Sequence, residues 1–254
     1  MKKKVDVKRI ISLIFALILL AGACYFGKEP VKKYVEVKQE TDENQEEFKN
    51  DVDKMIEFNG DAIAWISISN TNVDYPIVHS KDNKDYLRRN LKKEYSHGGT
   101  PFIDYRIKTP FSTGTTIIYG HNLNNGLVFS QLRNYSKTDW AKNHENITVY
   151  LKDGEVRNYK VFAFAKVNAS NADIYDVTVD TYEERNEYYK IVDKYNTLEM
   201  DAPDENHNIL MLSTCTNINK AERYVVWAYD IEDDTAPVTE GETNENNQPV
   251  LPLE

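Results

Sequence analysis

Cysteine is scarce in this 254-residue chain, which contains only Cys24 and Cys215. Cys24 lies inside an apolar N-terminal run, so a disulfide would tie that run to a core strand, and we discount it. The five histidines show no tight ligand spacing, and outside the apolar run there is no second cysteine, which argues against zinc. We therefore expect no metal and no cofactor. Cys215 is then a free thiol, which is either reactive or, as is commoner, a small buried apolar residue.

The chain has no excess of basic residues, with 31 Lys and Arg against 41 Asp and Glu and a formal net charge of −10. Basic residues are concentrated in residues 1–28, whereas residues 232–254 are acidic and contain no base. The stretch between them is mildly acidic and has no basic stripe, which argues against nucleic acid as a partner. The length and the 41% hydrophobic content suffice for one domain with a packed core.

A long apolar run occurs at the N-terminus, where a basic cluster at residues 2–9 precedes eighteen uncharged residues, 10–27. The run is just long enough to cross a membrane as a helix, and the basic cluster predicts a cytoplasmic N-terminus. We therefore predict a single-pass anchor over residues 1–27, with the rest of the chain extracellular. A cleaved signal peptide is the alternative, because small residues at 21–23 precede Cys24 as in a cleavage or lipoprotein site.

The rest of the chain divides into three parts. Residues 28–58 are charged with apolar side chains at irregular helical spacing, which predicts a stalk and an N-terminal helix. Residues 59–231 predict a mostly β catalytic domain, because short β-rich runs alternate with turn signals. Residues 232–254 have the composition of a disordered tail.

The spacing of the β-rich runs predicts a closed or nearly closed antiparallel barrel. Asp153 and Gly154 form a strong hairpin signal between two of these runs. A helix is expected at residues 181–195, between the sixth and seventh runs. The eight runs are residues 63–68, 73–78, 100–104, 115–119, 147–151, 156–167, 208–214 and 224–231.

The candidate catalytic residues lie at the ends of strand-like runs. Cys215 ends one apolar run, and Arg223 follows eight residues later at the start of another. Upstream, the run at 115–119 leads to Gly120, which permits a sharp turn, and then to His121. A cysteine nucleophile reacts as the thiolate, its leaving group needs an acid, and a guanidinium can stabilise an oxyanion. Thiol, imidazole and guanidinium together predict an acyl-transfer enzyme.

Arg223 interrupts an otherwise apolar final strand, where its charge is costly to bury without a partner. It either faces Cys215 as an oxyanion or substrate-binding group, or forms a salt bridge with Glu222 or Asp104. If the two strands pair as an antiparallel hairpin, Cys215 and Arg223 approach each other across its open end. That geometry favours a functional role.

Several sequence blocks, found in order along the chain, resemble the signature blocks of the sortase family. Around the three catalytic candidates these are residues 118–122, with Phe129 and Leu132 just downstream, residues 212–215 and residues 222–226. Blocks that resemble class B sortases in particular are residues 65–68, 75–78, 99–104 and the helix at 181–195. The resemblance covers the chain from about residue 58 to residue 231.

The resemblance implies an eight-stranded sortase barrel with an N-terminal helix, on the outer face of a Gram-positive-type membrane. It implies that Cys215 cleaves a threonyl peptide bond in a C-terminal sorting signal and forms a thioacyl enzyme. An amine of a peptidoglycan precursor or cross-bridge then resolves this intermediate. By position, His121 is the acid–base and Arg223 the oxyanion or substrate-positioning group. The partners implied are surface proteins with sorting signals, the peptidoglycan amine and, through the N-terminal helix, the membrane.

Four further residues are candidates for substrate binding. The hydroxyls of Ser213 and Thr214 either bind the substrate or the thiolate, or are ordinary strand residues satisfied by neighbouring backbone. Tyr119 and Asn122 flank His121 and either orient it or, in the case of Tyr119, pack in the core.

Other functions fit parts of the pattern. A cysteine L,D-transpeptidase also places His before Cys, but it has an Arg almost adjacent to the cysteine in a Ser-His-Gly-Cys context, which residues 213–216 lack. A papain-like amidase places its Cys before its His, the reverse of the order found in this chain. A non-catalytic membrane-tethered adhesin is the alternative from a different class, and it predicts that Cys215 is dispensable.

Overall fold

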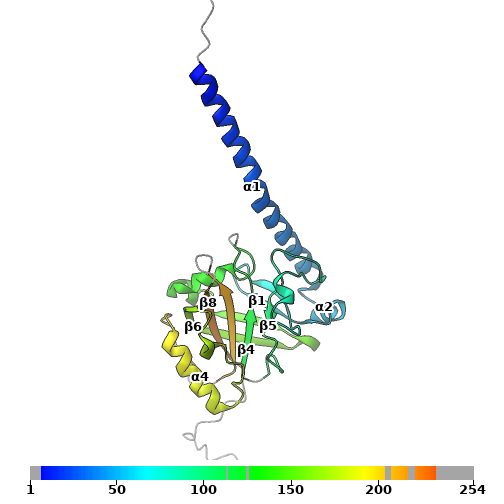
Figure 1. Cartoon of the computed structure of the whole chain (residues 1–254). Coiled ribbons are helices and arrows are strands. Elements are labelled where there is room, and N and C mark those ends of the chain that lie inside the picture. The colour runs from blue at the N-terminus through cyan, green and yellow to red at the C-terminus, as the bar shows by residue number, and fades with distance from the viewer. Residues whose placement is uncertain (1–6, 113, 124–125, 204–206, 217–220, 233–254) are drawn as a thin grey trace, which may run out of the picture.

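A long helix leads into a β-barrel in the computed structural model (Figure 1). The structure describes residues 7–232 apart from 113, 124–125, 204–206 and 217–220, and within residues 7–27 only the backbone. Helix α1 spans Val7–Phe48, and its N-terminal part projects away from the barrel. The short helix α2 (Val52–Phe58) follows and begins at Asp51, whose side chain accepts a hydrogen bond from the Lys54 amide.

The prediction of a transmembrane helix at residues 10–27 is wrong, because none of the helices among the described residues qualifies as a membrane span in length and apolar character. The backbone of this segment belongs to the longer helix α1, which continues into the charged sequence after Lys28. Charged side chains are costly to place in hydrocarbon. The single-pass location with a cytoplasmic N-terminus, and the membrane as a partner through this helix, are corrected with it.

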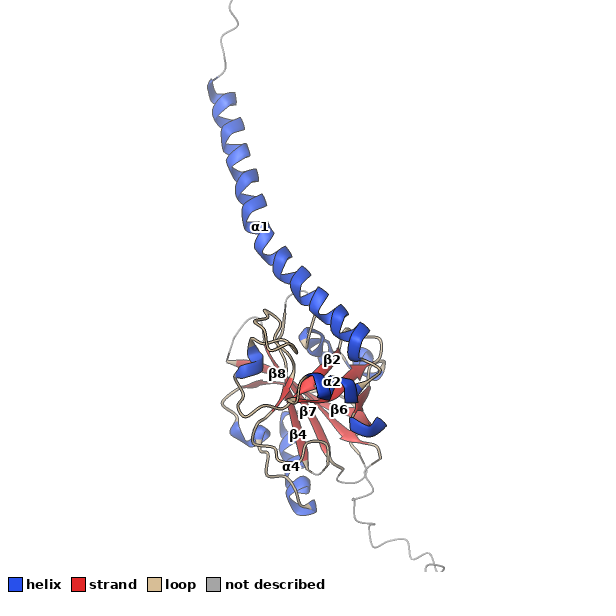
Figure 2. Ribbon diagram, turned by 90° about the vertical axis from the view of Figure 1, so that its right-hand side faces the viewer, coloured by secondary structure: helices blue, strands red, loops and turns tan. Residues whose placement is uncertain are grey.

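Eight strands close into a barrel in the order β1-β2-β3-β4-β7-β8-β6-β5. This confirms the predicted eight-stranded barrel, and every predicted run overlaps one observed strand. Figure 2 shows the strands gathered at the centre of the body with helices around them. The strands are β1 (Ala62–Ile68), β2 (Asp74–Val78), β3 (Phe102–Ile103), β4 (Thr115–Tyr119), β5 (Asn146–Tyr150), β6 (Val156–Asn168), β7 (Ile209–Cys215) and β8 (Glu222–Asp230).

The sheet is mixed and not wholly antiparallel as expected, because β2 pairs with β3 and β4 with β7 in parallel. Parallel neighbours need a long connection that returns the chain to the same end of the sheet. The segments at 79–101 and 120–208 supply those connections. The second parallel pair has a direct consequence for the site, since it aligns the ends of two strands that are far apart in sequence.

The helices and turns lie outside the barrel wall. The predicted helix is α4 (Tyr182–Tyr195), which begins with a capping box between Thr181 and Glu184. The β5–β6 hairpin turns at Asp153 and Gly154, both with positive φ, as its sequence predicted. The remaining short helices are α3 (Thr138–Lys142) and the 3₁₀ turns η1 (Asp85–Leu87), η2 (Ser130–Ser136), η3 (Lys152–Gly154) and η4 (Ala172–Tyr175).

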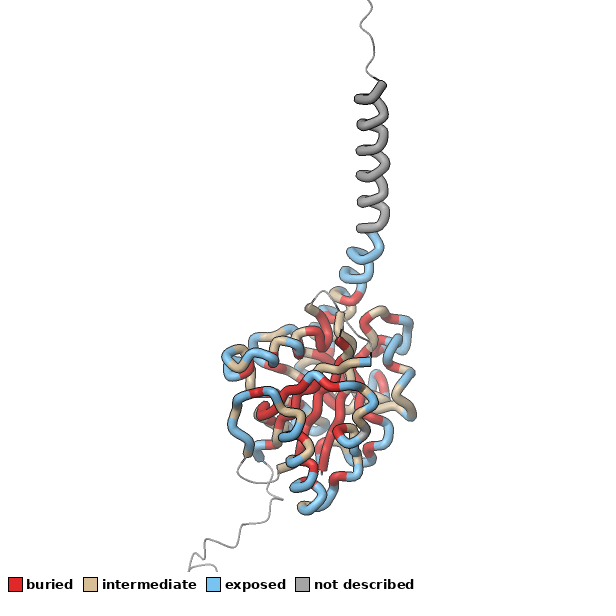
Figure 3. Tube along the Cα trace, turned by 60° about the vertical axis from the view of Figure 1, so that its left-hand side comes forward, coloured by how far each residue is buried: buried red, intermediate tan, exposed pale blue. Residues whose placement is uncertain are grey.

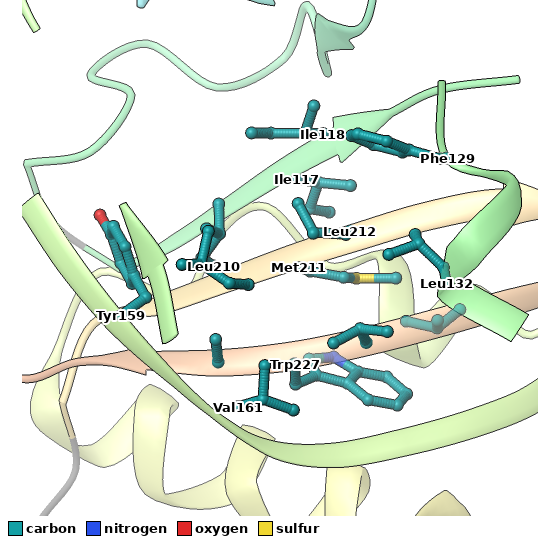
Figure 4. Packing of buried hydrophobic residues seen from close by; sticks show 14 of the residues in the cluster. Ile117, Ile118, Phe129, Leu132, Tyr159, Val161, Leu210, Met211, Leu212 and Trp227 are labelled. Carbon is teal, nitrogen blue, oxygen red and sulfur yellow. The ribbon is translucent and has the colours of Figure 1, made fainter. Parts of the chain in front are cut away.

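The core fills the barrel and includes Tyr188 and Val192 of α4. Figure 3 shows the buried segments gathered at the centre of the body. Ile117, Met211 and Trp227 are neighbours in register on β4, β7 and β8, and all three are fully buried (Figure 4). From α4, the hydroxyl of the buried Tyr188 accepts a hydrogen bond from Trp227 Nε1 at 3.2 Å. Every residue of β7 before Cys215 is also buried. The nucleophile candidate thus lies at the end of a strand that is packed along its length.

The predicted disordered tail at 232–254 lies, after residue 232, outside the described residues.

Candidate active site

The ends of β4 and β7 lie side by side at one rim of the barrel (Figure 2). Tyr119 is opposite Ser213 in the parallel register, and the Gly120 amide extends the ladder by donating to the Ser213 carbonyl at 3.1 Å. Because parallel strands leave a sheet at the same edge, the residue after Gly120 emerges beside the end of β7. The topology thus brings His121 to Cys215 across 94 positions of sequence.

The third candidate comes from β8, where Arg223 is the register partner of Cys215. The Arg223 Nη1 group donates to the carbonyl of Glu222 at 3.0 Å. Both acids considered as its salt-bridge partners have other partners. The Glu222 carboxylate lies 2.8 Å from Lys166 Nζ. The Asp104 carboxylate lies 2.8 Å from Nη2 of another arginine, Arg106.

A cavity of about 220 Å³ lies where these strand ends meet. Its lining includes all three catalytic candidates, and Cys215 is a half-buried free thiol. Larger hollows of about 300 and 410 Å³ lie at the β5–β6 hairpin and beside α1, and neither is lined by cysteine or histidine. The lining residues of the rim cavity are Asn83, Leu87, Phe102, Tyr119, Gly120, His121, Ser213, Thr214, Cys215 and Arg223.

The ring of His121 is held by Leu87, which also lines the cavity. Its Nε2 lies 2.7 Å from the carbonyl oxygen of Leu87. A carbonyl only accepts, so we assign the hydrogen to Nε2, and Nδ1 then carries the lone pair of the neutral ring. Burial lowers the pKa of His121, and although the bond to Leu87 opposes this effect, the nearby charge of Arg88 adds to it. The neutral imidazole therefore predominates at pH 7, with a lone pair that can take up a thiol proton.

Two of the predicted substrate-binding hydroxyls are already paired within the protein. The Tyr119 hydroxyl donates to Asp104 Oδ2 at 2.9 Å. The Ser213 Oγ lies 3.0 Å from the hydroxyl of Tyr175, a residue of η4. Both side chains therefore form part of the cavity wall, and their hydrogen bonds join that wall to other segments.

Of the other two candidates, Asn122 and Thr214, the first has a hydrogen-bond partner within the protein and the second has none among the described residues. The Asn122 Nδ2 group donates to the carbonyl of Cys215 at 2.8 Å, so Asn122 holds the end of the nucleophile strand. The hydroxyl of Thr214 is buried and has no hydrogen-bond partner among the described residues. A buried polar group without a partner is costly, so Thr214 is the candidate most in need of a ligand.

Several cavity residues were not expected from the sequence. Asn83, Leu87 and Phe102 line the cavity from the long connection between β2 and β3 and from β3 itself, and Tyr175 contacts its wall from the β6–β7 connection. No local pattern marks these positions, because they reach the site only through tertiary contacts. Among the described residues, no group of three or more His, Cys, Asp or Glu is arranged to hold a metal ion.

Gly120 is required by close packing, which gives a first prediction. A Cβ at this position would lie 2.5 Å from Cδ2 of the fully buried Phe129, whose amide donates to the His121 carbonyl. We expect Gly120→Ala to lower the free energy of unfolding by about 1–3 kcal/mol, as overpacking does. Urea unfolding measures this, with Gly60→Ala as the matched control because a Cβ there meets nothing within 4 Å. Equal stability of the two variants would contradict the packing argument.

The arrangement is suited to acyl transfer. A thiol, a ring nitrogen with a free lone pair and a guanidinium share one cavity. These groups supply a nucleophile, a proton carrier and a stabiliser of developing negative charge.

Comparison with known proteins gives consistent matches. A family model described as the sortase domain matches residues 66–231. The chain is 34% identical to sortase B of Listeria monocytogenes over 147 residues, which are 58% of this chain and 55% of that protein. It is 26% identical to sortase B of Staphylococcus aureus over 226 residues, 82% of this chain and 90% of the relative. The crystal structure of Clostridium perfringens sortase B has a TM-score of 0.66 and 28% identity, covering 71% of this chain and 99% of that one.

Proposed function

The chain belongs to the sortase family of cysteine transpeptidases, and we propose that it cleaves a threonyl peptide bond in C-terminal sorting signals of surface proteins. The cleaved protein is then transferred to an amine of peptidoglycan. The observation that supports this assignment is the register of three strands, in which β4 beside β7 and β7 beside β8 bring three side chains to one cavity. Those side chains are His121, Cys215 and Arg223.

In the first half of the reaction the thiolate of Cys215 attacks the threonyl carbonyl carbon, and a carbon–sulfur bond forms. The carbonyl oxygen becomes an oxyanion, which the guanidinium of Arg223 stabilises. As the carbon–nitrogen bond breaks, the imidazolium of His121 gives its proton to the departing amine, and the threonyl group remains as a thioester on sulfur. Burial lowers the pKa of His121, so only a minor fraction of the enzyme holds the imidazolium at neutral pH.

In the second half an amine attacks the thioester carbonyl. His121, now neutral, accepts the proton that the amine loses, and the collapse of the tetrahedral intermediate releases the Cys215 thiolate. The new peptide bond joins the surface protein to the acceptor, and water in place of the amine gives hydrolysis. The buried hydroxyl of Thr214, which has no hydrogen-bond partner in the part of the chain that the structure describes, is the group we propose to contact the bound peptide.

The proposal is tested by trapping the intermediate. The full chain is incubated with a library of threonine-containing sorting peptides, and each sample is digested and analysed by mass spectrometry. We expect an adduct on the peptide containing Cys215, with the mass of the substrate up to its threonine, which hydroxylamine removes as it does a thioester. The Cys24→Ala variant is the matched control and keeps the adduct. If no library member labels the folded protein, the proposed reaction is wrong.

Arg223 gives a second prediction. Arg223→Lys keeps the positive charge but loses the planar pair of donors, so stabilisation of the oxyanion is weakened. We expect kcat to fall about 10²–10³-fold, as after removal of one oxyanion donor, while KM changes little. Steady-state peptide cleavage measures both constants. A variant with normal kcat and a raised KM would instead make Arg223 a substrate-binding residue.

A further inference from the structure

A buried carboxylate lies behind the cavity wall and is not used by the proposed chemistry. Asp104 directly follows β3, and its side chain is only 1% exposed. An isolated buried carboxylate is very costly, so its partners must compensate for lost hydration. Arg106 forms a bidentate pair with this carboxylate, donating from Nε at 2.9 Å and from Nη2 at 2.8 Å. The Tyr119 hydroxyl adds a third side-chain hydrogen bond.

The charge state of this group follows from the same contacts. Burial opposes ionisation of Asp104, but the hydrogen bonds from Arg106 and Tyr119 outweigh it, and the pKa of the carboxyl lies below its usual range. The hydrogen bond to Asp104 correspondingly raises the pKa of Arg106. At neutral pH the two residues are therefore a fixed ion pair within reach of the cavity wall.

Arg106 also reaches a second segment. Its Nη2 group donates to the backbone carbonyl of Tyr175 at 3.0 Å, although the two residues are 69 positions apart. One guanidinium thus binds the carboxylate that holds Tyr119 and the connection between β6 and β7 that carries Tyr175. Both Nη2 hydrogens have an acceptor, and a planar, rigid donor group suits such a double contact.

Tyr175 in turn contacts the cavity wall from its other end. Its ring stacks on Tyr119, with centroids 6.2 Å apart, and its hydroxyl lies 3.0 Å from Ser213 Oγ, two residues before Cys215. Burial raises the pKa of Tyr175, and the hydrogen bond with Ser213 opposes this effect. The β6–β7 connection is therefore held by three contacts at Tyr175, and the one from Arg106 to its backbone carbonyl comes from a charged group.

From these contacts we propose that Asp104 and Arg106 are positioning residues, which hold the β6–β7 connection at Tyr175 against the cavity wall and thereby set how well the peptide substrate is bound. This inference rests on the proposed function for its substrate, but the contact itself is measurable without turnover. Neither residue touches the reacting atoms. The Arg106 side chain is 42% exposed, and partly exposed ion pairs add little stability, so holding one arrangement of the connection is the role that its contacts explain.

The test uses the full chain with the neutral double variant Asp104→Asn/Arg106→Gln, which leaves no unpaired buried charge. We expect amide hydrogen exchange in residues 172–178 to rise about tenfold in the absence of peptide, the effect of losing one hydrogen bond to a charged group. We expect KM for the sorting peptide to rise by a similar factor while kcat and the alkylation rate of Cys215 by iodoacetamide stay at wild-type values. The charge-reversed variant Asp104→Arg/Arg106→Asp should show the same raised KM, because an aspartate at position 106 cannot donate to the Tyr175 carbonyl.

Arg157→Gln is the matched control, because Arg157 pairs with another buried carboxylate, that of Asp230, at a distance of 3.6 Å. It should lower stability without changing either exchange at 172–178 or KM. If the folded double variant keeps wild-type exchange and KM, the positioning role is wrong. If wild-type protein cleaves no sorting peptide, the proposed function fails instead, and hydrogen exchange alone decides whether the pair holds the connection.

Discussion

Replacing Cys215 with alanine is expected to abolish peptide cleavage and transfer, lowering the rate by roughly 10⁴-fold or more, as loss of a covalent nucleophile does. Alanine has no group that can form the thioester, so neither half of the reaction proceeds. The side chain is half-buried at the end of β7, where the loss of one sulfur atom leaves the packed part of the strand unchanged. Steady-state cleavage of the best library peptide measures the effect.

The fold of this variant serves as its control. We expect circular dichroism and the urea midpoint of Cys215→Ala to match the wild-type values. A folded variant that still cleaves the peptide would remove Cys215 from the mechanism and would favour a different nucleophile. A folded and inactive variant would also exclude the non-catalytic adhesin, for which the thiol is dispensable.

Replacing His121 with glutamine is expected to lower kcat about 10²–10⁴-fold, the usual contribution of a positioned acid–base. Glutamine keeps an N–H donor that can reach the Leu87 carbonyl, but it carries no titratable proton. The thiol remains, so slow alkylation of Cys215 by iodoacetamide should persist after cleavage is lost. Single-turnover cleavage and alkylation, measured on the same sample, separate proton transfer from nucleophile access. Cleavage at a near wild-type rate would assign the proton carrier to another residue.

The same variant tests the electrostatics of the site through stability. The pKa of His121 is lowered by burial in the folded chain, whereas the unfolded chain has the ordinary value of about 6.5. As the pH falls below about 6.5 the unfolded state binds this proton first, so the stability of the folded state decreases until the folded pKa is passed. The wild type should therefore lose more stability than His121→Gln on acidification, by at most about 1.4 kcal/mol per pH unit. If the free energies of unfolding of the wild type and of His121→Gln change with pH in the same way, burial does not lower the pKa of the ring.

Much of the fold was predictable because local patterns act over a few residues. The apolar run that became β7, the β-branched run that became β4 and the Asp153–Gly154 turn each follow from short-range preferences. The pairing of those strands was not predictable in the same way. An all-antiparallel sheet was expected, and the observed parallel contact between β4 and β7 depends on a connection of almost ninety residues.

In the site, too, the residue types were predictable from the sequence and their contacts were not. His121, Cys215 and Arg223 were found as chemically capable residues at strand ends, and the cavity includes all three. For Tyr119 and Ser213 the sequence left a functional and a structural role open, and the structure adds that their hydroxyls contact Asp104 and Tyr175. Hydropathy along residues 10–27 suggested a membrane helix, and that interpretation did not agree with the helices that the structure describes.

Local properties of the sequence, hydrophobic periodicity and side-chain chemistry, were thus enough to locate the strands and the helix between the sixth and seventh of them, and to name three side chains able to perform acyl transfer. The folded arrangement was needed to see that β4 lies parallel to β7 and that Arg106 joins Asp104 to Tyr175. It was also needed to see that, among the described residues, the buried hydroxyl of Thr214 has no hydrogen-bond partner. These contacts join residues far apart in the chain, and closing such loops costs entropy that only the packing of the whole barrel can offset.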